Sequence, residues 1–200
     1  MIPHPIERRS YAILASRINL EGRSPGERAV IERIVHASAD LDFATSTIVD
    51  DRSVEIGIDA LRKGASVIVD VEMVGSGISN YPTQCYLREV IAGEGGFPTR
   101  SALAMRAAAD RHRAGAIFVI GCAPTALFEV VDLVRAGSLI PALVIGLPVG
   151  FVGAAESKEA AREAAHETGV AFITNEGEKG GSAVAAAAFN AIARLARDGQ

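Results

Sequence analysis

The stretch Ile117-Phe118-Val119-Ile120-Gly121-Cys122-Ala123-Pro124-Thr125 leads from an apolar run through a turn into a helix that extends to about residue 134. The apolar run does not alternate with polar residues, which is typical of a strand buried on both faces of a sheet. The same unit recurs twice afterwards, with strands at 142–146 and 170–174 and helices at 156–168 and 182–197. Strands that alternate with helices predict a parallel sheet with right-handed crossovers.

The residues before this series supply further strand candidates. A short β-branched run at 66–70 predicts another buried strand, and 84–91 is a more polar candidate that suits a sheet edge. Residues 41–48 are either strand or loop, and a short extended piece is the favoured interpretation.

Helix starts are marked by their capping residues. Ser24-Pro25-Gly26-Glu27 is a capping box with proline in the first turn. Thr99 is expected to cap a helix over 100–113, and Ser53 to cap an earlier one. The sequence therefore predicts one α/β domain over residues 1–200, a three-layer α/β/α arrangement in which helices cover both faces of a mostly parallel sheet.

Composition excludes several classes of protein. The net charge is -4 and no Lys/Arg cluster stands out, so a nucleic-acid partner is not expected. The N-terminus lacks the form of a signal peptide, and the apolar runs are too short to span a membrane. Cys85 and Cys122 give neither a metal-ligand spacing nor a disulfide framework. We expect a soluble cytoplasmic protein with no membrane partner and no resident metal.

Ile34-Val35-His36-Ala37-Ser38-Ala39-Asp40 is the stretch that we expect to carry chemistry. His36 lies beside an apolar helical stripe rather than within it, which suits the rim of a cleft. Histidine can both give and take a proton near neutrality. The alternative is a histidine that only finishes its helix and bonds locally.

Glycines gather where the predicted strands end, at 75–77, 121, 146–153 and 177–181. In a parallel sheet, ligands bind at the carboxyl ends of the strands, where glycine allows close approach and helix N-termini favour anions. Lys158, Lys179 and Arg100 lie nearby in the sequence, so the predicted ligand is large and multiply anionic. A nucleotide is the generic alternative, but neither a P-loop nor an early G-x-G-x-x-G is present. For Asp70 and Glu72, which end a strand, a structural role ranks first.

These stretches resemble the signature runs of the precorrin-8X (cobalt-precorrin-8) methylmutase family, and the resemblance covers nearly the whole chain in order. The matching runs are 34–40, 70–74, 99–101, 121–127, 147–158 and 179–183, of which Leu147-Pro148-Val149-Gly150-Phe151-Val152-Gly153-Ala154-Ala155-Glu156-Ser157-Lys158 is the most specific. Two departures are Cys122, where asparagine is expected in many relatives, and Glu178, which precedes Lys179 where a basic pair is common. Residues 76–84 also look less typical.

The resemblance implies an isomerase of corrin-ring synthesis. Such enzymes move a methyl group between adjacent carbons of one ring, giving hydrogenobyrinate or its cobalt form, cobyrinate. The resemblance also implies that no external cofactor is needed and that cobalt is present only if the tetrapyrrole substrate carries it. It further implies a homodimer with its site near the subunit interface. His36 matches the catalytic histidine and Ser10 a substrate-contacting serine. Taken with the glycine-rich strand ends, it gives these candidate substrate-binding residues: Arg9, Ser10, Met73, Thr99, Arg100, Ser101, Gly121, Cys122, Thr125, Gly150, Lys179, Gly180, Gly181 and Ser182.

Our hypothesis is that His36 protonates the macrocycle and later recovers the proton. Two alternatives come from other classes of protein. One is a carrier that binds a tetrapyrrole without converting it, and the other is a nucleotide-binding α/β domain. The sequence leaves open whether the substrate carries cobalt.

Overall fold

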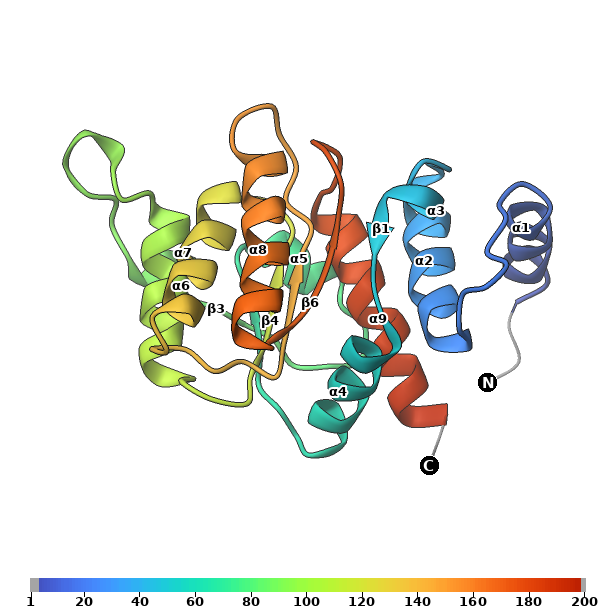
Figure 1. Ribbon diagram of the computed structural model, residues 1–200, viewed down its shortest axis with the longest axis horizontal. Helices are drawn as coiled ribbons and strands as arrows, with labels where there is room; N and C mark the ends of the chain where they lie inside the picture. Colours follow the sequence, from blue (N-terminus) through green and yellow to red (C-terminus); the bar gives the residue numbers. More distant parts are fainter. Residues whose placement is uncertain (1–3, 199–200) are drawn as a thin grey trace.

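A six-stranded sheet runs through the centre of the computed structural model, which describes residues 4–198 apart from the side chain of Glu94 (Figure 1). Residues 1–3 and 199–200 of the predicted domain lie outside the described residues. The sheet order is β1-β6-β5-β4-β2-β3; β1 is antiparallel to β6, and the other neighbours are parallel. The strands are β1 (Thr47–Ile48), β2 (Val67–Val69), β3 (Gln84–Cys85), β4 (Ile117–Ile120), β5 (Leu143–Gly146) and β6 (Ala171–Asn175).

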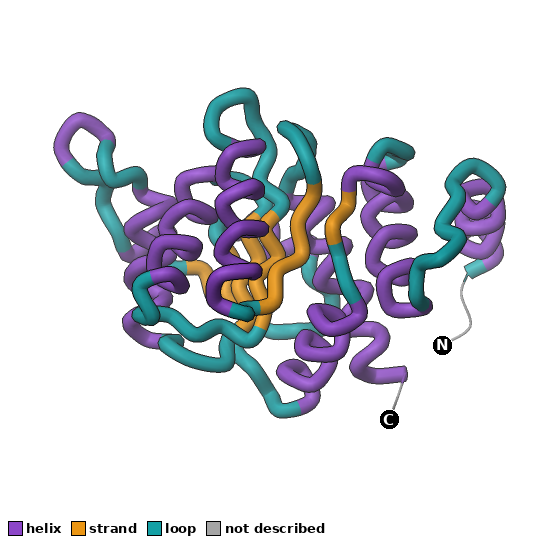
Figure 2. Tube along the Cα trace, viewed as in Figure 1, coloured by secondary structure: helices purple, strands orange, loops and turns teal. Residues whose placement is uncertain are grey.

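Helices cover both faces of this sheet, which confirms the predicted α/β class and its three layers (Figures 1 and 2). The helices α6 (Arg100–Arg111), α7 (Pro124–Arg135) and α8 (Ala154–Thr168) lie on one face. The helices α4 (Asp51–Arg62), α5 (Glu72–Gly77) and α9 (Ser182–Asp198) lie on the other. Farther out, α2 (Pro25–Ser38) packs on α9, and α1 (Pro5–Ala15) packs on α2.

The core explains why the central strands carry no polar alternation. In β4, Ile117 and Val119 face the α4/α9 side, while Phe118 and Ile120 face the α6/α7/α8 side, and all are fully buried. Both faces of the strand therefore need apolar side chains.

The capping predictions are confirmed at two helices and wrong at a third. Ser24 and Thr99 accept hydrogen bonds from the backbone N–H groups of Glu27 and Ala102, as N-cap residues do. Ser53 does not cap α4, because the carboxylate of Asp50 accepts the Ser53 N–H at 2.7 Å. Serine and aspartate are both common N-cap residues, and here Asp50, three residues before Ser53, is the one that caps α4.

Three segments differ from the expected secondary structure. Only Gln84–Cys85 of the predicted strand 84–91 pairs with β2, and Leu87–Glu89 forms a 3-10 turn. The expected extended piece at 41–48 is split into a short helix α3 (Phe43–Ser46) and β1. The glycines at 75 and 77 lie within α5 and not in a strand-end loop.

A second 3-10 turn spans Glu94–Gly96. Among residues 4–198, no helix is both long and apolar enough to cross a bilayer.

Candidate active site

His36 lies in the last turn of α2 with its side chain half-buried, beside the buried stripe formed by Val30, Ile31, Ile34 and Val35. The Ser10 hydroxyl, from α1, lies 3.1 Å from its Nδ1. No hydrogen-bond partner of Nε2 occurs among the described residues 4–198. The ring is thus held at one nitrogen, and the other nitrogen bonds to none of residues 4–198.

The neighbours of Ser10 on α1 complete this end of the site. Arg9 is exposed and directly precedes Ser10 in α1. The Tyr11 ring stacks on the His36 ring with centroids 4.6 Å apart and an angle of 5° between the planes. Sequence reasoning missed Tyr11, because nothing in the pattern of α1 shows that it faces a residue on another helix.

Lys179 connects the loop after β6 to the segment after His36. Its Nζ donates to Asp40 Oδ2 at 2.7 Å and to Asp42 Oδ2 at 2.6 Å. The bond from Lys179 holds the pKa of Asp40 below its usual value, and the two carboxylates raise the pKa of Lys179. The charge of this predicted substrate contact is therefore largely offset within the protein. Its contact with substrate stays a prediction.

The loops that follow β4, β5 and β6 touch one another at the carboxyl end of the sheet. The Gly181 N–H donates to the Leu147 carbonyl at 2.9 Å, and the Gly150 N–H to the Glu178 carbonyl at 3.1 Å. A Cβ on Gly121 would lie 2.8 Å from Ser182 Cα. The structure therefore brings together most of the glycines predicted from the strand ends.

Gly180 is required by close packing alone. A Cβ at this position would meet the carbonyl oxygens of Leu147 and Pro148 at a distance that real Cβ atoms do not adopt. Glycine therefore lets the β6–α9 loop lie directly against the β5–α8 loop.

Asp70 organises the turn that contains Cys122. Its side chain is fully buried after β2, and its carboxylate accepts backbone N–H groups of Gly121 at 3.1 Å, Cys122 at 2.9 Å and Ala123 at 3.0 Å. Burial raises the pKa of Asp70, and the N–H donors act against that rise. The structural role that ranked first for this residue is confirmed. The exposed Cys122 side chain stands on a backbone that this carboxylate holds.

The remaining candidates lie on helix starts at the same end of the sheet. Thr99 Oγ1 and Thr125 Oγ1 are 2.7 Å apart, which joins the start of α6 to the start of α7. Arg100 donates to the Leu87 and Val90 carbonyls at 2.7 and 3.3 Å, so its guanidinium holds that segment in place. Ser101 is half-buried on α6, and Met73 is 72% exposed in the first turn of α5.

Lys158 is buried beneath the β6–α9 loop rather than exposed to an anion. Its side chain is 1% accessible, and its Nζ donates to the Lys179 carbonyl at 2.7 Å and to Asn175 Oδ1 at 3.2 Å. Asn175 donates to the same carbonyl at 2.9 Å. Burial lowers the pKa of Lys158 to about 8, although the charge of Glu178 opposes this shift. The ammonium therefore anchors the loop from below.

We expect Lys158 to make the free energy of unfolding depend on pH. Its pKa is about 8 in the folded chain against an ordinary value of 10.5, so the folded chain binds fewer protons between these values. The free energy of unfolding should therefore rise with pH across this window, by up to about 3 kcal/mol, and the gain is lost as pH falls through 8. Urea unfolding at several pH values measures this rise. Lys158→Met should lack it.

Lys63→Met is the matched control, because Lys63 is exposed at the end of α4. Its stability should follow the wild-type pH curve. Parallel curves for the wild type and Lys158→Met would contradict the role of Lys158.

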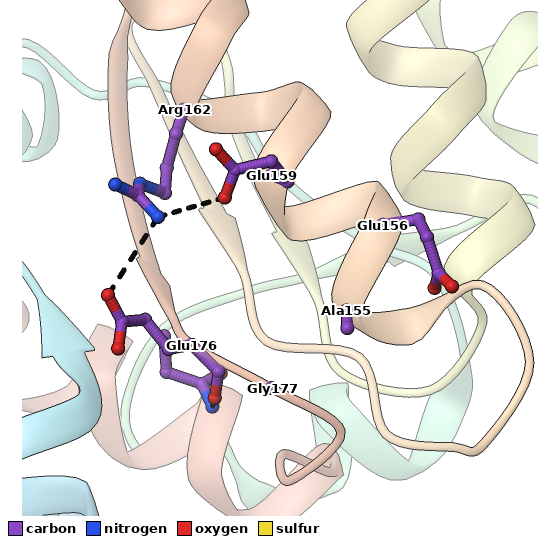
Figure 3. Close-up of a pocket in the computed structure, with 7 residues that line it drawn as sticks. Ala155, Glu156, Glu159, Arg162, Glu176 and Gly177 are labelled. Atoms are coloured by element: carbon purple, nitrogen blue, oxygen red, sulfur yellow. Dashed lines mark hydrogen bonds and ion pairs between the residues drawn. The ribbon is translucent and has the colours of Figure 1, made fainter.

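A cavity of about 440 Å³ lies between the first half of α8 and the end of β6 (Figure 3). Arg162 lies 2.9 Å from Glu159 and 3.9 Å from Glu176 across this cavity, and Glu156 also lines it. The excess of carboxylates disfavours an anionic ligand there, so this cavity does not match the predicted cleft. Within residues 4–198 no group of three or more His, Cys, Asp or Glu side chains is arranged to hold a metal ion.

Comparison with known proteins gives a consistent result over the whole chain. The family model described as precorrin-8X methylmutase matches residues 5–195. The cobalt-precorrin-8 methylmutase of Methanothermobacter thermautotrophicus is 41% identical, over 98% of this chain and 94% of its own. The precorrin-8X methylmutase of Pseudomonas aeruginosa is 39% identical, over 94% of this chain and 93% of its own.

A solved structure agrees with the sequence relatives. The crystal structure of precorrin-8X methylmutase from Thermus thermophilus superposes with a TM-score of 0.82 at 35% identity, covering 98% of this chain and 99% of its own. The chain therefore belongs to the precorrin-8X methylmutase family, whose members are isomerases of cobalamin biosynthesis.

Proposed function

We propose that this chain moves a methyl group between adjacent ring carbons of precorrin-8X or cobalt-precorrin-8, giving hydrogenobyrinate or cobyrinate. Family membership supports the reaction, and the relatives carry both the metal-free and the cobalt names. The observation that carries the mechanism is the His36 ring, which Ser10 holds at Nδ1 while Nε2 bonds to none of residues 4–198.

His36 acts in this proposal as proton donor and acceptor. The methyl group leaves one carbon and bonds to its neighbour, so no protein nucleophile is needed. Protonation of the macrocycle adjusts its conjugation, and the same nitrogen takes the proton back at the end. No electrons are gained or lost, so we propose that no external cofactor takes part and that cobalt enters only with the substrate.

The starts of α7 and α9 and one exposed cation are suited to the carboxylates that fringe a tetrapyrrole. The loops at Gly121, Gly150 and Gly180–Gly181 meet at one end of the sheet, close to the starts of α7 and α9. Free N–H groups at helix starts favour anions. Arg9 adds an exposed positive charge beside Ser10.

We further propose that the enzyme works as a cytoplasmic homodimer. Large apolar side chains are exposed on loops at this end of the molecule, with Phe151 90%, Val152 89% and Phe97 75% accessible. A second copy would remove such a surface from water. Light scattering of the purified protein gives the oligomeric state, and a monomeric mass at assay concentration would contradict the proposal.

Gly180→Ala should lower kcat/KM, by as much as about 100-fold. The new Cβ would push the β6–α9 loop away from the Leu147 and Pro148 carbonyls and so displace groups proposed to bind substrate. Steady-state kinetics measures the loss.

Gly137→Ala serves as the control. Unlike Gly180, Gly137 has a positive φ, 67°, so alanine strains the backbone there, but a Cβ meets nothing and the residue lies at the far end of α7. This variant should keep wild-type kcat/KM. Equal kinetics for Gly180→Ala and the wild type would show that the contact between the two loops does not shape the site.

The proposal is tested by following the absorption spectrum of the precorrin-8 substrate, in metal-free and in cobalt form, after purified protein is added. Conversion to the product chromophore supports the isomerase. Tight binding of both forms without conversion would indicate the carrier. Thermal stabilisation by nucleotides and not by corrin intermediates would indicate the nucleotide-binding domain.

A further inference from the structure

Tyr11 covers one face of the imidazole that the proposed reaction uses. The two rings are 4.6 Å apart and almost parallel, at 5°. Tyr11 directly follows Ser10, so adjacent residues of α1 contact His36 in two different directions. Ser10 fixes a nitrogen in the ring plane, and Tyr11 fixes the plane itself.

The Tyr11 ring is held in turn by Arg33. Arg33 donates to the Tyr11 hydroxyl at 3.3 Å and lies 3.4 Å from Glu7 Oε1. The bond to Tyr11 is the main reason that the pKa of Arg33 is raised. Arg33 and His36 lie one turn apart on α2, and Glu7 and Tyr11 one turn apart on α1. The two helices are thus clamped together at the level of the histidine.

The His36 ring needs the stacked tyrosine because Ser10 supplies its one side-chain hydrogen bond from residues 4–198. The salt bridges of residues 4–198 include no carboxylate bonded to the ring, although a carboxylate is a common partner that orients a catalytic histidine. One hydrogen bond leaves the ring free to turn about the Nδ1 direction. A stacked ring removes that freedom, and it remains favourable when the imidazole carries a charge because aromatic faces attract cations.

We propose that Tyr11 is a positioning residue for His36, and that Arg33 locks Tyr11 in the stacked position. Together they aim Nε2 at the substrate. This inference rests on the proposed function, in which His36 transfers the proton. Tyr11 itself exchanges no proton and touches no reacting atom.

Tyr11→Leu and Tyr11→Phe separate the ring from the hydroxyl. Loss of the ring should lower kcat roughly ten- to hundredfold with KM nearly unchanged, because a misaimed group slows the chemical step more than binding. Tyr11→Phe keeps the ring but loses the bond from Arg33, so it should retain most of kcat, with a loss much smaller than that of Tyr11→Leu. Ile13→Ala, at an exposed position of the same helix, is the control that should match the wild type.

A nuclear magnetic resonance measurement tests the geometry without substrate. Stacking should shift the His36 ring protons upfield, and the shift should persist in Tyr11→Phe and vanish in Tyr11→Leu. His36→Gln assigns the signal. An unshifted His36 signal in the wild type would overturn the inference even if Tyr11→Leu failed to fold.

Two kinetic results would also overturn it. One is a wild-type kcat for Tyr11→Leu when His36→Ala is inactive. That result would overturn the role of Tyr11 but leave the proposed function intact. The other is an equal loss of kcat in Tyr11→Phe and Tyr11→Leu, which would assign the effect to the hydroxyl or to helix packing. A fully active His36→Ala would instead overturn the proposed function, whatever the Tyr11 variants do.

Discussion

His36→Ala should lower kcat by a factor of about 10² to 10⁴, which is the usual contribution of a positioned acid–base group. The fold should survive, because His36 is only half-buried and the stripe that packs α2 consists of its apolar neighbours. Substrate should still bind, since the glycine loops and helix starts are untouched. A spectral titration at equilibrium would show this binding without conversion.

His166→Ala is the matched control for this substitution. His166 is exposed on α8, and its removal should leave kcat unchanged. Added imidazole should restore part of the activity of His36→Ala, because it can supply the missing proton donor. If His36→Ala converted substrate at the wild-type rate, His36 would not be the proton-transfer group.

Asp70→Asn should lower the free energy of unfolding by about 3 kcal/mol, because buried N–H donors lose their acceptor. The carboxylate shares its two oxygens among the N–H groups of Gly121, Cys122 and Ala123. Asparagine has the same shape but offers only one oxygen. Its side-chain NH₂ group would face the backbone N–H donors, with which it cannot form a hydrogen bond. Urea unfolding measures the loss.

The turn held by Asp70 belongs to the proposed site, so Asp70→Asn should also lower kcat/KM. Asp132→Asn on the exposed surface of α7 is the control and should change neither quantity. Unfolding curves of Asp70→Asn and the wild type that coincide would show that the carboxylate does not hold this turn.

The central fold could be predicted because its signals are local. The run at 117–120 carries its own evidence of burial on both faces, and Ser24 and Thr99 mark helix starts within three residues of their partners. The edges of the sheet were less predictable. Whether 84–91 is a strand depends on how much of β2 remains exposed for pairing, and only Gln84–Cys85 finds partners there.

The candidate site could likewise be predicted only in part. Glycines at strand ends indicated the loops that meet, because parallel strands bring their carboxyl ends to one edge. Contacts between distant segments left no trace in the sequence. The stacking of Tyr11 on His36, the burial of Lys158 and the pairing of Lys179 with Asp40 each depend on how separate helices and loops pack.

The most direct test of the proposed isomerase is turnover of excess precorrin-8 substrate, followed at once by absorption and by mass spectrometry. We expect the chromophore to change over many turnovers while the molecular mass stays the same, since the methyl group moves within one molecule. His36→Ala, run in parallel, should leave the substrate chromophore in place. A spectral change that stops at one equivalent of bound substrate, with the metal-free and the cobalt form alike, would contradict the assignment.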